Sequence, residues 1–182
     1  MNIVEKTKNY FLETVKKSGP KYWYLDRHLP EVEKWAHKIL ERKPEANKEV
    51  VMLGVWLHDI GQMIGDQELD HAINSEIEAK RFLSQAGVDP SIIDQVASCV
   101  RAHRCKDVQP ESLEAKILAV ADSASHMTDI VYIDMAARGD KEGAKAKLER
   151  DFRDKGLFPE LQEESKPLYE AWKQLLDVYP SV

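Results

Sequence analysis

The chain has 182 residues, of which 43% are hydrophobic and 32% charged, and its formal net charge is -6. These values are ordinary for a soluble globular domain with a full core. The negative balance argues against general binding to nucleic acid or to an anionic membrane surface. No apolar run reaches the ~20 residues of a membrane span, and the N-terminal residues lack the apolar core of a signal peptide. We therefore expect a cytoplasmic protein.

Apolar residues recur at helical spacing along the whole chain, and no stretch of useful length alternates as a strand would. The sequence therefore predicts an all-α fold, an irregular helical bundle. The expected helices cover about 3–17, 26–40, 46–63, 70–87, 90–105, 112–137, 141–155 and 159–179. Gly19-Pro20 and Gly139 should interrupt the chain, because glycine suits a left-handed cap and proline cannot continue a helix. Asp26, Asp70 and Asp89 are the expected N-caps.

The two cysteines, Cys99 and Cys105, fall in one predicted helix. The helical rise of about 1.5 Å per residue would leave them about 9 Å apart, beyond the reach of a disulfide. We expect free thiols, as is usual in a reducing compartment.

An apolar stretch, residues 50–57, ends abruptly in His58-Asp59-Ile60-Gly61. A buried imidazole and carboxylate are costly unless they are paired or bound to metal, and both side chains ligate metals. Neighbouring residues on a helix point about 100° apart, so the pair cannot chelate one ion as two histidines one turn apart do. His58 can instead hold one ion while Asp59 reaches a second.

Four more potential ligands, His28, His71, His103 and Asp122, stand in or beside other predicted helices. Asp122 ends the apolar run K-I-L-A-V-A-D, where a carboxylate has no obvious surface role. Each histidine also has an ordinary interpretation. His28 and His71 suit exposed positions in a first helical turn, and His103 suits a solvated cation at a helix C-terminus, where the helix dipole favours it.

Taken in the order H…HD…H…H…D, these residues resemble the HD-domain superfamily of metal-dependent phosphohydrolases. The segment HLPEVEKWA from His28 resembles its first-histidine helix, and HDIG from His58 resembles its name-giving motif. The segments HAINSEIEAKRFL from His71 and VRAH ending at His103 resemble the two additional histidine helices of dinuclear members, and ILAVADS around Asp122 resembles the final aspartate helix. The resemblance covers about 21–127 and implies an all-α fold.

The resemblance implies two metal ions with Asp59 as the bridging ligand. One ion would take His28, His58, Asp59 and Asp122, and the other would take Asp59, His71 and His103. His58, Asp59 and Asp122 become the expected catalytic residues. A histidine-rich site with carboxylates favours Fe or Mn, with Zn, Co and Ni remaining open. We expect hydrolysis of a small phosphate ester or nucleotide through a metal-activated hydroxide.

Lys106, Gln62 and His126 are the candidate substrate contacts. Lys106 follows His103 by three residues, although a solvated charge cluster with Arg101 and Arg104 is the better explanation of this run. Gln62 stands where many relatives carry lysine directly after H-D-x-G, which weakens the case for a highly anionic substrate at that corner. His126 lies four residues after Asp122, on the same helix face, where it would touch the ligand, the substrate or only a neighbouring helix.

Two other functions stay open. Some HD-fold relatives use the same six ligands around two irons to activate dioxygen and cleave C–C or C–P bonds. Tyr24, four residues before His28, resembles an aromatic gate in such oxygenases, and simple packing also explains it. The remaining alternative is a non-catalytic nucleotide-sensing module. We expect a single domain over 1–182, with a metal-site core at about 21–127 and C-terminal helices at 141–179 packing on it, and the oligomeric state is left open.

Overall fold

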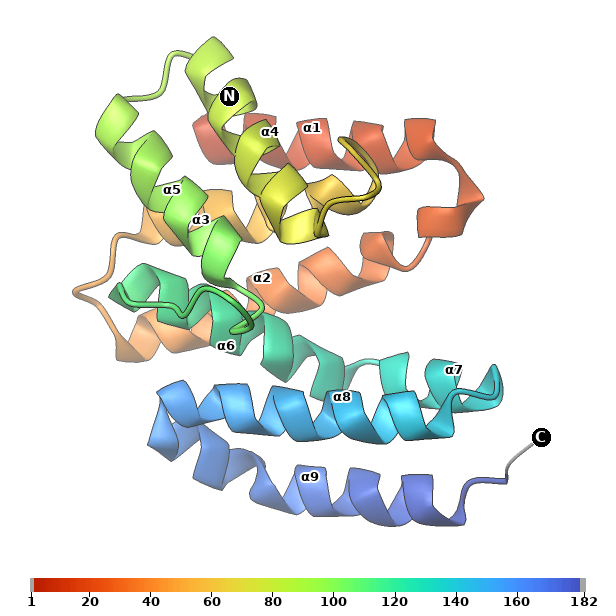
Figure 1. Ribbon diagram of the computed structural model, residues 1–182. Helices are drawn as coiled ribbons and strands as arrows, with labels where there is room; N and C mark the ends of the chain where they lie inside the picture. The colour runs from red at the N-terminus through yellow and green to blue at the C-terminus, as the bar shows by residue number, and fades with distance from the viewer. Residues whose placement is uncertain (1, 181–182) are drawn as a thin grey trace. The chain divides into compact units, whose positions relative to one another are not determined.

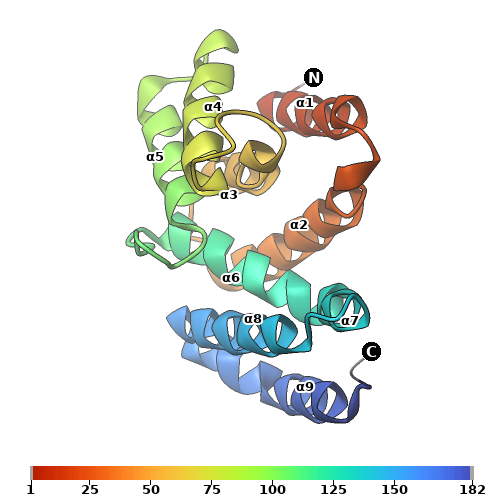
Figure 2. The ribbon, with the colours of Figure 1, turned by 45° about the vertical axis from the view of Figure 1, so that its right-hand side comes forward.

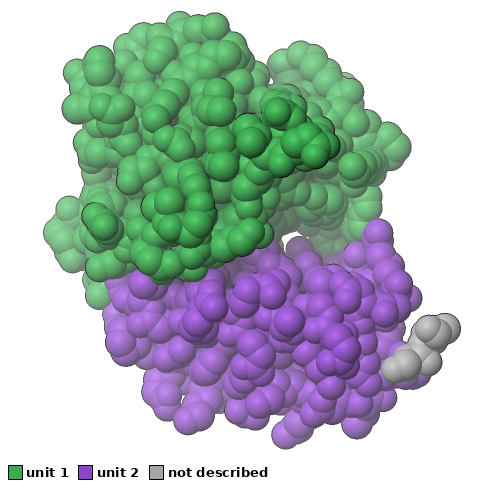
Figure 3. Space-filling view, in the orientation of Figure 1, with its two compact units in different colours: residues 1–119 green, residues 120–182 purple. Residues whose placement is uncertain are grey.

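The structure, a computed structural model, describes residues 2–180, and within that range it contains only α-helices, short 3-10 helices and connecting turns. The predicted all-α fold is confirmed. The chain divides into two compact units, Met1–Ala119 and Val120–Val182, coloured green and purple in Figure 3. Among the described residues no helix is both long and apolar enough to cross a membrane. That the C-terminal helices pack on the metal-site core remains a prediction.

The first unit is built around one buried helix. Its elements are α1 (Ile3–Ser18), η1 (Pro20–Tyr22), α2 (Leu25–Arg42), α3 (Lys48–Leu57), η2 (Ile60–Gln62), α4 (His71–Gln85), α5 (Pro90–Ala102) and the first part of α6 (Leu113–Thr128). Every residue of α3 from Val50 to Leu57 is buried, as expected of a helix that is apolar on all sides. Helices α1, α2, α4 and α5 pack against it, and α4 and α5 lie side by side (Figures 1 and 2).

Most of the predicted helix ends are confirmed. Gly19 and Gly87 follow α1 and α4 with φ angles of 89° and 75°, a left-handed conformation that glycine adopts without strain. The carboxylates of Asp70 and Asp89 accept the backbone N–H groups of Ala72 and Ser91 and so cap α4 and α5. The Asp26 cap is wrong, because α2 already begins at Leu25.

Two helices are shorter than the sequence predicts, and both end beside a potential ligand. The helix expected over 46–63 ends at Leu57, so His58 and Asp59 lie in the turn between α3 and η2. The helix expected to contain His103 and Cys105 ends at Ala102, and Cys105 adopts a φ angle of 48° in the following turn. Neither Cys99 nor Cys105 forms a disulfide bond, as expected.

The expected long helix over 112–137 is also interrupted, because α6 ends at Thr128 and α7 (Val131–Ala137) begins after a two-residue break. The hydroxyl of Thr128 donates to the carbonyl of Ser125, and the carboxylate of Asp129 accepts the N–H of Ile130. Such local side-chain bonds compete with the backbone ladder of a helix. The second unit continues with α8 (Lys141–Asp154), η3 (Lys155–Leu157) and α9 (Pro159–Val178), around a core that includes Tyr132, Leu148 and Leu176.

Candidate metal centre

His58 and His103 are placed in the same way, each directly after the last residue of a helix, α3 and α5 respectively. Nδ1 of His58 lies 2.9 Å from the carbonyl oxygen of Val55, and Nδ1 of His103 lies 2.6 Å from that of Val100. A carbonyl only accepts, so each Nδ1 carries the hydrogen. Nε2 is therefore the nitrogen of each ring that is left to offer a lone pair to a metal. Both residues are almost fully buried, with exposures of 0% and 3%.

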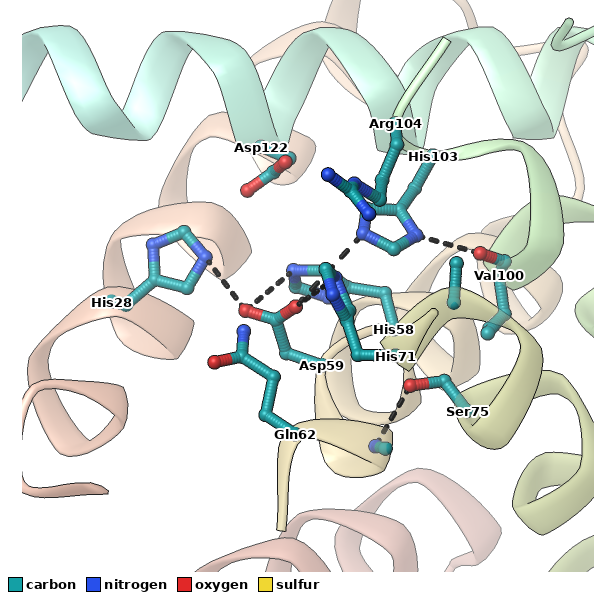
Figure 4. A network of polar contacts seen from close by, with 12 residues as sticks. His28, His58, Asp59, Gln62, His71, Ser75, Val100, His103, Arg104 and Asp122 are labelled. Atoms are coloured by element: carbon teal, nitrogen blue, oxygen red, sulfur yellow. Dashed lines mark hydrogen bonds and ion pairs between the residues drawn. The ribbon is translucent and has the colours of Figure 1, made fainter. Parts of the chain in front are cut away.

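His28 and His71 come from two other helices of the same unit. His28 lies in the first turns of α2 and is buried, and His71 is the first residue of α4 and is partly exposed. The ring centroids of His28 and His58 lie 5.6 Å apart, those of His58 and His103 4.9 Å apart and those of His71 and His103 5.4 Å apart, so the four imidazoles form one cluster. Four helices thus bring one imidazole each to a common place (Figure 4).

The carboxylate of Asp59 lies among these imidazoles and presents a different oxygen to each of two pairs (Figure 4). Its Oδ2 is 3.5 Å from Nε2 of His28 and 3.7 Å from Nε2 of His58. Its Oδ1 is 3.3 Å from Nε2 of His71 and 3.9 Å from Nε2 of His103. One buried carboxylate therefore faces two separate pairs of imidazole nitrogens.

Gly61 explains how Asp59 comes so close to α4. A Cβ at this position would lie 2.2 Å from the carbonyl oxygen of His71 and 2.5 Å from the backbone nitrogen of Ser75, which no real side chain tolerates. The missing side chain lets η2 pass directly against the first turn of α4, where the N–H of Gly61 donates to the hydroxyl of Ser75 at 2.8 Å. The glycine of the HDIG motif is thus a close-contact residue.

The donor set suits a divalent transition metal. One ligand atom each from His58, Asp59 and His103 lie within 4.8 Å of one another, and nitrogen with carboxylate oxygen is a common donor combination for such ions. Burial alone would raise the pKa of the Asp59 carboxyl, but the charge of His58 and the hydrogen bond from His71 lower that pKa well below its ordinary value. The carboxylate is therefore in the anionic form that a cation needs.

Tyr24 and Gln62 lie beside this cluster. The phenol of Tyr24 donates a hydrogen bond to the side-chain oxygen of Gln62. Burial, together with the nearby negative charge of Asp59, raises the pKa of Tyr24 to about 12, so its hydroxyl keeps its proton at neutral pH. The structure thus places Gln62 next to Tyr24, and the role of Gln62 in binding substrate remains a prediction.

A charged group lies next to His71. The guanidinium of Arg104 donates to Oδ2 of Asp70, and the ammonium of Lys106 lies 3.6 Å from the same oxygen. Burial would raise the pKa of Asp70, but the N–H of Ala72 and the guanidinium of Arg104 outweigh it and lower that pKa. The sequence assigned Arg104 to a solvated charge cluster, and its side chain is exposed and pairs with Asp70. The available signal for this pairing was position, because Asp70 and Arg104 directly adjoin His71 and His103.

Asp122 and His126 belong to the second unit. Nε2 of His126 lies 3.6 Å from Oδ1 of Asp122, which confirms that the two share a helix face, and its Nδ1 lies 3.3 Å from Oδ2 of Asp151. The ammonium of Lys147 lies 3.1 Å from the same Nδ1. His126 therefore connects Asp122 to a buried polar group on α8. The metal-binding role of Asp122 and the substrate-binding roles of His126 and Lys106 remain predictions.

Comparison with known proteins gives one match. Residues 25–127 match the family model described as HD domain. This range begins at the first residue of α2 and includes the four imidazoles, Asp59 and Asp122. No curated protein and no solved structure matches the chain.

Proposed function

The chain belongs to the HD-domain family, and on that premise we propose that it is a metal-dependent phosphohydrolase acting on a small phosphate ester or nucleotide. The family is one of mostly metal-dependent hydrolases, and the cluster of histidines and aspartate is compatible with a metal site. The observation that carries the proposal is the arrangement of Asp59, whose two carboxylate oxygens face different pairs of imidazoles.

In this proposal Asp59 is the ligand shared by two ions. His28 and His58, whose Nε2 atoms face Oδ2, would hold the first ion, and His71 and His103, whose Nε2 atoms face Oδ1, would hold the second. Asp122 would be the remaining ligand of the first ion, a role that the sequence pattern supports. Fe and Mn are the favoured ions, because imidazole with carboxylate suits them and a site of oxygen ligands alone suits Mg.

Bound ions would lower the pKa of water and neutralise charge that develops on phosphate oxygens. The chain's own residues contribute position and surroundings. The carbonyls of Val55 and Val100 hold the rings of His58 and His103 in one orientation, so little reorganisation is needed on binding. Lys106 is 65% exposed near His71, and we propose that it turns from Asp70 to an anionic group of the substrate.

One observation favours a second candidate, a di-iron oxygenase that cleaves a C–C or C–P bond. Tyr24 resembles an aromatic gate of such enzymes, and its hydroxyl is bonded to Gln62 close enough to Asp59 for the carboxylate to raise the pKa of the phenol. Gln62 is also uncharged where many hydrolase relatives have lysine. Hydrolysis remains the first proposal, because it is the commoner chemistry of the family.

The deciding experiment compares hydrolysis with oxygen uptake on one preparation. The apo-protein is loaded with Mn under argon and offered a panel of nucleotides and phosphomonoesters. Phosphate release should require no dioxygen, because Lewis acidity involves no redox change. It should disappear in His58→Gln and persist in His37→Gln, which changes a histidine of α2 outside the cluster.

Each other outcome points to a different function. If no panel member is hydrolysed and the iron-loaded chain consumes oxygen when substrate is present, the protein is the oxygenase. If nucleotides bind in equilibrium dialysis and neither reaction occurs, the protein is a nucleotide-sensing module.

A further inference from the structure

Next to the proposed ligands, an ion pair joins the two helices that supply the second ion. We propose that the pair of Asp70 and Arg104 holds His71 at the correct distance from His103 and so determines how tightly the second ion binds. The inference rests on the proposed function, since it concerns the same site. It assigns a positioning role to two residues that are not themselves ligands.

The first support is where the two residues stand. Asp70 is the N-cap of α4 and directly precedes His71, and Arg104 directly follows His103 at the end of α5. The guanidinium of Arg104 donates to Oδ2 of Asp70, and Figure 4 shows Arg104 beside His103. The ion pair therefore connects the backbone of one ligand to the backbone of the other, one residue away from each.

The second support is that Asp70 uses its two oxygens for different purposes. Oδ1 accepts the N–H of Ala72 at 3.0 Å and lies 3.8 Å from Nδ1 of His71. Oδ2 forms the ion pair with the guanidinium of Arg104. The first oxygen fixes the start of α4, where His71 is located. The second oxygen ties that start to the turn that follows α5. A shift of Arg104 would thus move the beginning of α4 relative to His103.

The third support is that His71 lacks the anchor that holds its neighbours. Carbonyls of their own helices orient the rings of His58 and His103. Among the described residues no backbone carbonyl is hydrogen bonded to a ring nitrogen of His71, and its side chain is 27% exposed. The position of His71 therefore depends more on where α4 begins, which is what Asp70 and Arg104 set.

A second arginine of α5 provides a matched control. Arg101 also reaches α4, where its Nε lies 3.8 Å from the carboxylate of Glu76, and it forms a second ion pair with Asp107. It joins the same two helices through a residue that does not adjoin a ligand. If a general attachment of α4 to α5 were sufficient, Arg101 and Arg104 would be equivalent.

The test is a Mn titration of the apo-protein, with bound ions counted by elemental analysis and affinities measured by calorimetry. The binding site that is lost in His71→Ala is taken as the site of the second ion. Asp70→Asn deletes the charge and keeps an N-cap, because asparagine caps a helix as well as aspartate does. Arg104→Gln deletes the partner. Losing a residue that orients a ligand typically lowers the affinity for the metal about tenfold to a hundredfold.

We expect Asp70→Asn and Arg104→Gln each to lower the affinity for the second ion about tenfold and to leave the affinity for the first ion unchanged. The double variant should bind the second ion no more weakly than either single variant does, since the two residues act as one pair. Arg101→Gln should bind both ions as the wild type does. Circular dichroism and the melting temperature confirm that each variant is folded.

Three results would overturn the inference. In the first, the wild type binds two ions and both variants bind them with unchanged affinity, which refutes the positioning role and leaves the proposed function intact. In the second, Arg104→Gln and Arg101→Gln lower the affinity for both ions equally, which shows that the pair of Asp70 and Arg104 only stabilises the fold in general. In the third, the wild type binds fewer than two ions, which contradicts the two-ion site itself.

Discussion

Oδ1 of Asp59 lies 3.3 Å from Nε2 of His71, so the carboxylate that follows α3 reaches the first residue of α4. The other oxygen of the same carboxylate lies 3.5 Å from Nε2 of His28, on α2. One side chain therefore lies between histidines of two different helices, α2 and α4. A carboxylate placed this way can serve two cations at once, and removing it should affect both.

The first prediction follows from that placement. Asp59→Ala should bind neither ion tightly, because the shared ligand and the charge that balances two cations are lost together. His71→Ala should keep the first ion, since His28 and His58 face Oδ2, the other oxygen of Asp59. The measurement is the metal content of each variant after loading and gel filtration. An Asp59→Ala protein that carries two ions per chain would refute the bridging assignment.

The second prediction concerns Gly61. Gly61→Ala would place a methyl group 2.2 Å from the carbonyl oxygen of His71, and backbone atoms cannot yield as a flexible side chain can. The free energy of unfolding should fall by about 1–3 kcal/mol, the usual cost of overpacking. The second ion should also bind more weakly, because η2 and α4 are forced apart.

Gly156→Ala is the control for that variant. The three atoms nearest to a Cβ there would belong to the side chain of Gln162, the closest at 3.2 Å, and a flexible side chain can shift at the cost of its bond to the carbonyl of Phe152. Urea unfolding of the two apo-variants measures the difference. Equal stability of Gly61→Ala and Gly156→Ala would show that the approach of η2 to α4 is not tight.

The third prediction concerns Lys155 in the second unit, whose side chain is only 1% exposed. Burial lowers the pKa of its ammonium to about 8, although the negative charges of Asp151 and Glu164 oppose the shift. The pKa in the unfolded chain is about 10.4. Between these two values the unfolded state binds more protons than the folded state, so stability should rise with pH. The gain over this window is at most roughly 3 kcal/mol.

Lys155→Met removes the buried charge and nearly keeps the length of the side chain. It should be more stable than the wild type at pH 7 and should lack the rise above pH 8. Lys166→Met, at a position that is 58% exposed, should change neither property. Urea unfolding of the apo-proteins between about pH 7 and 10 provides the measurement. If the free energy of unfolding changes with pH in the same way in the wild type and in Lys155→Met, the lowered pKa of Lys155 is contradicted.

The sequence alone determined the helical class, most of the helix ends and the match of the chain to a family pattern. These features depend on local chemistry. Residues 50–57 are apolar on all sides, so α3 is buried, and Asp70 can cap a helix because its side chain reaches a backbone N–H two residues away. The ligand candidates could be identified because polar side chains at the ends of apolar helices require partners.

Only the tertiary structure decided how those candidates meet. The helices of His58 and His103 stop one residue before the histidine, where each ring binds the carbonyl three residues back. Helical periodicity cannot reveal this stop. The division of the Asp59 oxygens between two imidazole pairs and the bond from Arg104 to Asp70 involve residues that are distant in sequence. Their distances depend on how α2, α4 and α5 pack around α3, which no local pattern encodes.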